Sequence, residues 1–359
     1  MYRCITRALV ALIVLLAGTL AWGEPSRESA DTDGIAAVAT TNIVGDIVAT
    51  VGGDRLSLYV MLPLDADPHA FRATPRDARQ VADADVVFIN GAGLEADFLG
   101  DLIASAAPRL IVDLSAHLSL RRMMDGDDEE EHEDEHGHDD DEEDHDGDEE
   151  DHDDDEEDHD DDEEDHDDDE EGHDDDEEDH DHGEFDAHVW MDPTLVAVWA
   201  AEIAEALAEI DPEHGADYAR RADTFVGELD GLDAWIRDQV ATVPHDRRIL
   251  VTDHEVFGYF ADRYGFTVLD AIIPGFSTVS EPSARHLADL REAISEHAIP
   301  AIFVGTTVNP QVARVVADDL GIEVVAVYTG SLSEPDGPAA SYLEFMRTNV
   351  ERIVAALSE

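Results

Sequence analysis

The chain is poor in cysteine and in basic residues. Its one cysteine, Cys4, lies in a segment that we expect to be removed, so the mature protein would have no disulfide bond, no thiolate metal ligand and no cysteine placed for lipidation. Lys and Arg total 21 against 90 Asp and Glu, which gives a formal net charge of −69. A protein this acidic is a poor partner for nucleic acid or an anionic membrane surface, and it attracts cations instead.

Apolar runs long enough to span a membrane are also lacking. The apolar run at residues 8–20 is too short for an ordinary transmembrane helix. Two arginines precede it and small residues follow it, an order typical of a secretory signal peptide, and we expect cleavage after Gly23. We therefore predict that residues 1–23 are a signal peptide and that the mature chain is a free periplasmic protein. An uncleaved amphipathic anchor is the alternative.

Hydrophobic residues are plentiful, at 43% of 359 residues, which is enough to bury the cores of about two domains. Short apolar stretches of strand type alternate with stretches of helical periodicity on both sides of an acidic run. Apolar strands separated by helices pair in parallel within a doubly wound sheet. We predict the α/β class, with one lobe at residues 34–210, a second at 244–359, and a long rigid helix at 211–243 joining them.

A run of acid and histidine interrupts the first lobe. Every residue of 127–184 is Asp, Glu, His or Gly, and the run holds 44 of the 90 acids, which leaves the rest of the chain with a net charge of −25. With no apolar side chain to bury, this insert is expected to be disordered. Six of its histidines, from His145 to His180, recur every seven residues, as in an expanded repeat. Its ten histidines are candidates for weak accessory metal ligands: His132, His136, His138, His145, His152, His159, His166, His173, His180 and His182.

Two interpretations of the insert stay open. Its carboxylates raise the local concentration of divalent cations and its imidazoles add a preference for zinc, so it could collect the metal. Alternatively, it is a solvated spacer that grew by repeat slippage and serves solubility alone. We favour collection, because solubility does not require ten histidines among 58 residues.

Three single histidines outside the insert are candidate metal ligands. His69 lies in LPLDADPHAFRATPRD, His188 in FDAHVWMDPT and His254 in RRILVTDHEVFGYF. Two of them follow predicted strands, whose carboxyl ends form the edge where ligands bind in open parallel sheets. Three imidazoles that converge there would suit Zn²⁺, whereas Mg²⁺ or Ca²⁺ would require oxygen ligands. We expect five other single histidines to be surface residues: His117, His214, His245, His286 and His297.

The motifs DPHAFRATPRD, DAHVWMDPT and HEVFGYFADRYG occur in this order, with a His- and acid-rich insert before the second. Together they resemble the cluster A-I solute-binding proteins of zinc and manganese ABC importers, and the resemblance covers nearly all of the chain from Gly34 onward. It implies two α/β lobes with the metal in the cleft between them, His69 and His188 as ligands from the first lobe, and His254 as a ligand from the second. It also implies a binding protein and not an enzyme. An adhesin-like role is also known in the family.

The fourth ligand of the family is a carboxylate, and its position falls on Gly330 in this chain. Glu334 or Asp336 could reach the metal from the same loop, or a water could complete a site of three histidines. A second acid often found in the family, after the strand AIFVG, is replaced by Gly305. The fourth ligand therefore stays open between a loop carboxylate and water.

Three histidines resemble the zinc members of the family, since the manganese members tend to use two histidines and two carboxylates. We expect a monomeric, high-affinity periplasmic zinc-binding protein that delivers Zn²⁺ to the membrane permease of an ABC importer, with the insert as an accessory collector. Other periplasmic metal chaperones are candidate partners, and nucleic acid is not. Zinc binding should weaken as the pH falls below the histidine pKa of about 6.5, because a protonated imidazole cannot bind metal.

Three alternatives compete with this prediction. The protein could be a manganese receptor of the same family, or a periplasmic zinc buffer or chaperone dominated by the insert. It could also be a zinc hydrolase with Glu255, beside His254, as general base. None of the three single histidines begins an HExxH motif, and Glu255 is expected to open a helix that points away from the cleft, so the hydrolase is disfavoured.

Overall fold

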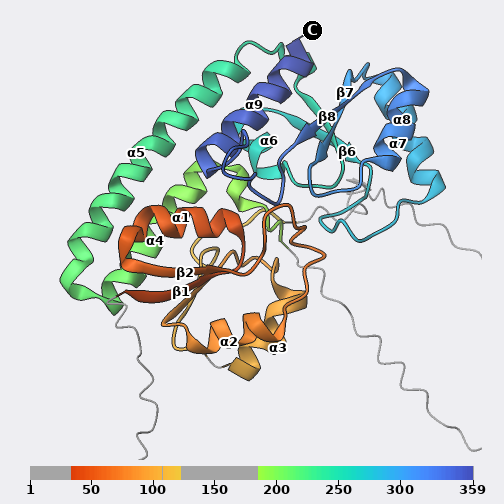
Figure 1. Cartoon of the computed structure of the whole chain (residues 1–359). Helices are drawn as coiled ribbons and strands as arrows, with labels where there is room; N and C mark the ends of the chain where they lie inside the picture. Colours follow the sequence, from red (N-terminus) through yellow and green to blue (C-terminus); the bar gives the residue numbers. More distant parts are fainter. Residues whose placement is uncertain (1–33, 107, 123–184, 359) are drawn as a thin grey trace, which may run out of the picture.

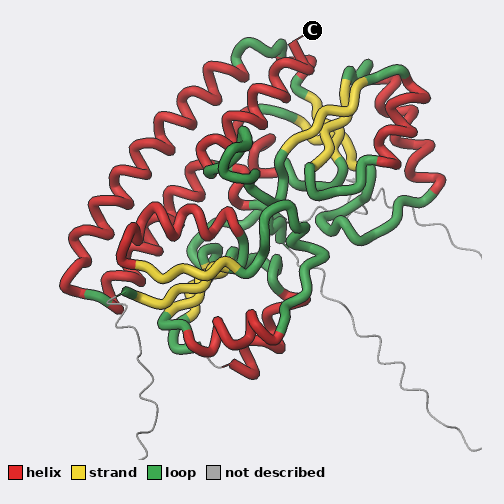
Figure 2. The backbone as a smooth tube through the Cα atoms, in the orientation of Figure 1, coloured by secondary structure: helices red, strands yellow, loops and turns green. Residues whose placement is uncertain are grey.

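The computed structural model describes residues 34–106, 108–122 and 185–358, arranged as two lobes beside a long helix (Figure 1). The predicted signal peptide and the acidic insert with its ten histidines lie outside the described residues. Strands and helices alternate in the order that the sequence predicts, and each lobe contains a four-stranded parallel sheet. The loops gather between the two sheets (Figure 2).

The first lobe contains four strands and four helices: β1 (Ile35–Ala39), α1 (Asn42–Gly52), β2 (Leu56–Val60), α2 (Pro75–Asp83), β3 (Val86–Ile89), α3 (Ala96–Ala106), β4 (Ile111–Asp113) and α4 (Pro193–Ile210). The strand order is β2-β1-β3-β4. Because side chains of a strand alternate between the two faces of a sheet, Ala37 and Ala39 pack in one cluster with α1 and α4, whereas Val38 packs with α2 and α3. Helices therefore cover both faces of this sheet.

The second lobe repeats this plan with four strands and four helices: β5 (Ile249–Thr252), α6 (Gly258–Tyr264), β6 (Thr267–Ala271), α7 (Ala284–Glu296), β7 (Ala301–Gly305), α8 (Gln311–Leu320), β8 (Glu323–Val327) and α9 (Tyr342–Ser358). The strand order is β6-β5-β7-β8. Leu250 and Phe303 pack with α6 and α9, whereas Val251 and Ile302 pack with α7 and α8. Both lobes are thus doubly wound, and the predicted fold class is confirmed.

A helix of 26 residues, α5 (Gly215–Val240), runs along both lobes (Figure 1). It packs on α1 and α4 of the first lobe and on α6 and α9 of the second, so one apolar cluster continues from lobe to lobe. Short 3₁₀ helices lie at four other points: η1 (Gly53–Arg55), η2 (Val189–Met191), η3 (Pro212–His214) and η4 (His245–Arg247). None of the described helices is both long enough and apolar enough to cross a membrane.

Helix caps fix the ends of the two first-lobe loops that carry candidate histidines. Thr74 and Asp77 form a capping box at the start of α2, in which the Thr74 backbone N–H donates to the Asp77 carboxylate at 2.6 Å, and Pro75 takes the first helical position. Asp192 caps α4 by accepting a hydrogen bond from the Thr194 backbone N–H at 2.8 Å. The loops that end at these caps are therefore tied to rigid helices.

Candidate metal centre

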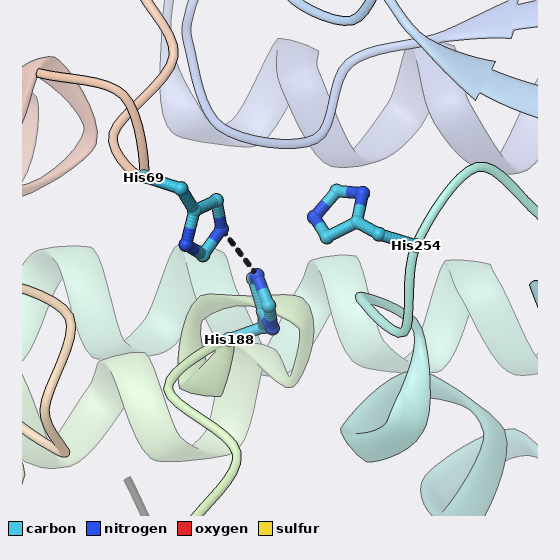
Figure 3. Close-up of side chains that lie close together, drawn as sticks. All are labelled: His69, His188 and His254. Carbon is cyan, nitrogen blue, oxygen red and sulfur yellow. Dashed lines mark hydrogen bonds between the residues drawn. The ribbon is translucent and has the colours of Figure 1, made fainter. Parts of the chain in front are cut away.

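The three single histidines His69, His188 and His254 come together between the lobes, with their rings turned toward one another (Figure 3). One nitrogen from each ring lies within 4.8 Å of the corresponding nitrogen of the other two. The ring centroids are 5.2 to 5.4 Å apart, and Nε2 of His69 lies 3.2 Å from Nε2 of His188. Three imidazole nitrogens at this spacing can bind one metal ion between them.

His188 is held by an acid of its own lobe. It is buried and precedes η2, and the carboxylate of Asp186 accepts a hydrogen bond from its backbone N–H at 2.9 Å and lies 2.8 Å from its Nδ1. Because the same oxygen, Oδ1, accepts from the backbone N–H, it also acts as an acceptor toward the ring, so Nδ1 carries the proton and Nε2 keeps its lone pair for a metal. Burial raises the pKa of Asp186 to about 7, while the backbone N–H of His188 and the guanidinium of Arg121 lower it.

His254 is held in the same way in the second lobe. It follows β5, and the carboxylate of Asp253 accepts from its backbone N–H at 2.9 Å and lies 2.9 Å from its Nδ1. The second oxygen of Asp253 accepts from the backbone N–H of Gly305 at 2.8 Å. The turn after β5 is thereby tied to the end of β7, and the ring of His254 is fixed with Nε2 available.

His69 differs from the other two. It lies in the loop between β2 and α2 and is partly exposed, whereas His188 and His254 are buried. Its backbone N–H donates to the carboxylate of Asp67 at 2.9 Å. Among the described residues, none forms a hydrogen bond with its Nδ1. The ring of His69 therefore lacks the carboxylate support that orients the other two.

The surroundings keep His69 and His188 in the form that binds metal. Burial and the neighbouring rings of His188 and His254 lower the pKa of His69 well below its usual value of 6.5. Burial and the ring of His254 lower the pKa of His188 in the same way. Both rings are therefore neutral at neutral pH, and they stay neutral at a lower pH than the sequence alone suggests.

No carboxylate belongs to this histidine group in the described parts of the chain. Glu334 and Asp336, which the sequence offered as fourth ligands, are exposed on the loop after β8 and lie outside the group. A Cβ atom added at Gly330 would lie 2.7 Å from Cδ of Pro68, and one added at Gly305 would lie 2.2 Å from Oγ1 of Thr329. The space that a side chain would need at either glycine is thus already filled.

The predicted helix at Glu255 is wrong. The chain bends at this residue, and α6 begins at Gly258. The carbonyl oxygen of His254 accepts hydrogen bonds from the Val256 backbone N–H and the Thr252 hydroxyl, which closes a tight turn before the helix can start. The carboxylate of Glu255 accepts from the backbone N–H of Gly275 at 3.1 Å, so it is engaged in a loop contact.

The five histidines predicted to be surface residues lie outside the group. Four have other partners: His117 contacts Glu202, His214 contacts Asp211, His286 contacts the carbonyl of Ala271 and His297 contacts the carbonyl of Ala293. Sequence reasoning missed two site residues, the aspartates that hold His188 and His254. An acid one or two positions before each histidine was the signal that could have found them.

Two doubly wound lobes with a nitrogen-rich site between them are the arrangement expected of a metal-binding receptor of an ABC importer. The family described as "Zinc-uptake complex component A periplasmic" matches residues 37–356. The chain belongs to this family. It is therefore a periplasmic, metal-binding component of an ABC importer, which implies a membrane permease as partner, and it is not an enzyme.

The names of related proteins mention different metals. This chain is 25% identical to the manganese-binding lipoprotein MntA of Halalkalibacterium halodurans over 99% of both chains. It is also 25% identical to the zinc-binding protein TroA of Treponema pallidum, over 99% of this chain and 98% of TroA. Among solved structures, the periplasmic zinc-binding protein TroA of Treponema pallidum matches with a TM-score of 0.71 at 23% identity, covering 91% of this chain and all of that one. A manganese-bound periplasmic protein of Candidatus Liberibacter asiaticus matches with a TM-score of 0.67 at 20% identity, covering 89% and 98%. These similarities show the fold. Because they include zinc and manganese proteins, the choice of metal must be argued from the chemistry of the site.

Proposed function

We propose that the protein captures Zn²⁺ with His69, His188 and His254 and delivers it to the permease of a zinc importer. The observation that carries this proposal is the convergence of three imidazoles, contributed by both lobes, without a carboxylate in the group. Nitrogen ligands suit Zn²⁺, which readily takes four ligands with one position open to water. Water as the fourth ligand fits the exposed positions of Glu334 and Asp336.

Two features favour zinc over manganese. The ligand atoms are nitrogens, whereas Mn²⁺ suits carboxylate, carbonyl and water oxygens and binds more weakly to a given set of ligands. In addition, Pro68 and Thr329 occupy the space next to the two glycines that replace acids of the family, so a carboxylate cannot enter there without rearrangement. The lowered pKa values of His69 and His188 keep both rings neutral, as the binding of either metal requires. Cu²⁺ and Ni²⁺ would also bind such a set in a test tube.

The capture step needs only residues of this chain. Asp186 and Asp253 hold the protons of their histidines on Nδ1, so that Nε2 of each ring presents a lone pair without reorganisation. Because the ligands come from both lobes, a bound ion ties the lobes together. Docking of the permease on both lobes would then release the ion by disturbing this arrangement. We expect the protein to act as a monomer after cleavage of residues 1–23, with lobe boundaries near 210 and 244.

The acidic insert, residues 127–184, is proposed as an accessory zinc collector, with periplasmic metal chaperones as candidate partners. The described residues that flank it are close together in the fold: Arg122 and Phe185 form an antiparallel bridge, and the Asp186 backbone N–H donates to the Arg121 carbonyl at 2.8 Å. Removing the insert and joining these ends with a short turn therefore preserves the first lobe. A zinc buffer dominated by the insert would lose its function in such a deletion.

The deciding experiment is a competitive titration of the mature chain with Zn²⁺ and, in parallel, with Mn²⁺. It compares the full chain, the deletion of 127–184, and His254→Ala in both backgrounds. The proposal predicts one tight zinc site that survives the deletion and collapses in His254→Ala, with much weaker manganese binding. Tight zinc binding that disappears with the insert and ignores His254→Ala would overturn the proposal in favour of a buffer. Tighter binding of manganese than of zinc would favour the manganese receptor.

A further inference from the structure

The support of His69 comes from the opposite lobe. His188 and His254 are each oriented by an aspartate of their own lobe, at 2.8 and 2.9 Å from Nδ1. The loop that carries His69, residues 61–74, belongs to the first lobe, but three contacts join it to loops of the second. These contacts fall on the residues just before the histidine.

The first contact joins Asp67 to Thr278. One carboxylate oxygen of Asp67 accepts the backbone N–H of His69 at 2.9 Å, and the other accepts the hydroxyl of Thr278. Thr278 lies in the loop between β6 and α7 of the second lobe. The same carboxylate thus links the backbone of the metal-binding residue to the other lobe.

The second contact joins Asp65 to Ser331. Asp65 has a φ of 60°, a left-handed conformation that few residues other than glycine adopt, and its backbone N–H donates to the Ser331 hydroxyl at 2.9 Å. Ser331 is buried in the loop after β8, where its oxygen also accepts from the Asn42 side chain at 3.0 Å and donates to the Leu332 carbonyl at 3.0 Å. The bonds to Asn42 and Leu332 therefore fix the Ser331 hydroxyl. Its bond with the Asp65 backbone N–H then stabilises the left-handed turn.

The third contact is steric and involves the residue next to His69. The ring of Pro68 packs on Gly330, where an added Cβ would lie 2.7 Å from Cδ and 3.0 Å from Cγ of the proline. Real Cβ atoms essentially never approach this closely, so any larger residue at 330 would push Pro68 and, with it, His69. Gly330 is thus required for the observed position of the loop that carries His69.

We propose that Thr278, Gly330 and Ser331 of the second lobe are positioning residues for His69, so that a first-lobe ligand reaches the site only while the second lobe is in contact. This inference rests on the proposed zinc site and adds the order in which the histidines release the metal. Separation of the lobes removes the three contacts and frees the His69 loop, whereas His188 and His254 keep their aspartates. A permease that parts the lobes would therefore withdraw His69 first.

The test is a set of double-mutant cycles on zinc affinity. Thr278→Val removes the hydroxyl and keeps the shape, and Gly330→Ala adds the one atom that Pro68 excludes. Each should weaken zinc binding about tenfold, the scale of lost outer supports of metal ligands, and should speed zinc release to a chelator. In a His69→Ala background neither change should weaken binding further, because its effect is transmitted through that histidine.

Matched controls separate positioning from general damage. Gly227→Ala on α5 adds a Cβ with nothing within 4 Å, and Thr224→Val removes an exposed hydroxyl that bonds only within the same helix. Both should leave zinc affinity unchanged, and the zinc-free melting temperatures of Thr278→Val and Gly330→Ala should remain near that of the parent. Unchanged affinity in these two variants, or equal losses with and without His69, would overturn the positioning role while the zinc site stands. Unchanged affinity in His254→Ala would overturn the zinc site itself.

Discussion

Two segments of the first lobe, DPH at residues 67–69 and DAH at 186–188, have the same spacing of acid and histidine and use the acid differently. In DAH, the carboxylate of Asp186 lies 2.8 Å from Nδ1 of its own histidine. In DPH, the carboxylate of Asp67 contacts Thr278 of the other lobe. Tertiary contacts, and not spacing, therefore decide which partner such an acid takes. One histidine is held by its own lobe, and the other depends on the contact between lobes.

The largest expected effect compares His188→Ala with His69→Ala. Each removes one of three ligands, so each should weaken zinc binding by about a hundredfold or more. Only His188→Ala should also destabilise the zinc-free protein, by about 3 kcal/mol, because it leaves the buried Asp186 without its imidazole partner. His69→Ala removes a partly exposed ring without such a partner and should cost about 1 kcal/mol or less. Chelator competition measures zinc affinity, and urea unfolding of the zinc-free chain measures stability. Equal losses of stability in the two variants would contradict the proposed difference between His188 and His69.

The aspartates themselves give the next largest effect. Asp253→Asn and Asp186→Asn keep the shape of the side chain and remove its charge, so Nδ1 of the histidine loses its strong acceptor. Zinc affinity should fall by about ten- to a hundredfold. Asp246→Asn, at an exposed position of η4, is the matched control and should leave the affinity unchanged. Unchanged affinity in both test variants would show that carboxylate support is not what distinguishes these histidines from His69.

A carboxylate introduced at residue 330 tests what the glycine does for the His69 loop. Gly330→Asp places an acid where the family resemblance expects one, but its Cβ must displace Pro68. Zinc affinity should fall about tenfold, as in Gly330→Ala, because the steric effect is common to both. Parallel zinc and manganese titrations of the two variants separate size from charge. A gain of manganese affinity in the aspartate variant alone would show that the loop can yield and that the glycine governs the choice of metal.

The sequence predicts the parts of this site that local chemistry decides. Apolar strands that alternate with helices predict both doubly wound sheets, as the structure confirms. The three histidines were recognisable from their motifs. The start of α6 was not, because the turn at His254 depends on hydrogen bonds that compete with the helix for the same carbonyl oxygen.

The contacts that hold His69 could not be predicted from the sequence. Asp67 and Thr278 are 211 residues apart, and nothing in either segment indicates the other. In the sequence, Gly330 indicates only that the family's carboxylate ligand is missing. In the structure, the absence of a side chain at Gly330 leaves room for the ring of Pro68. The role of Gly330 can be recognised only once its neighbour Pro68 is known, and Pro68 belongs to the opposite lobe.

The smallest expected effect concerns pH and the zinc-free protein. Burial and neighbouring rings lower the pKa of His69 and His188, whereas both rings titrate near 6.5 in the unfolded chain. Below about pH 6.5 the unfolded state therefore binds protons that the folded state does not, and folding stability falls as the pH decreases. The loss is at most about 1.4 kcal/mol per pH unit for each ring, and it is absent above that pH.

Urea unfolding of the zinc-free chain between about pH 7.5 and about pH 5.5 measures this loss of stability. Many carboxylates also titrate at the acid end, so the difference between variants carries the information. Stability should depend less steeply on pH in His69→Ala and in His188→Ala than in the parent, and Thr224→Val, which changes no titratable group, should keep the parent slope. Equal slopes in all four proteins would mean that the two rings take up protons as readily in the folded chain as in the unfolded one. The surroundings of the site would then not keep these two histidines ready for metal.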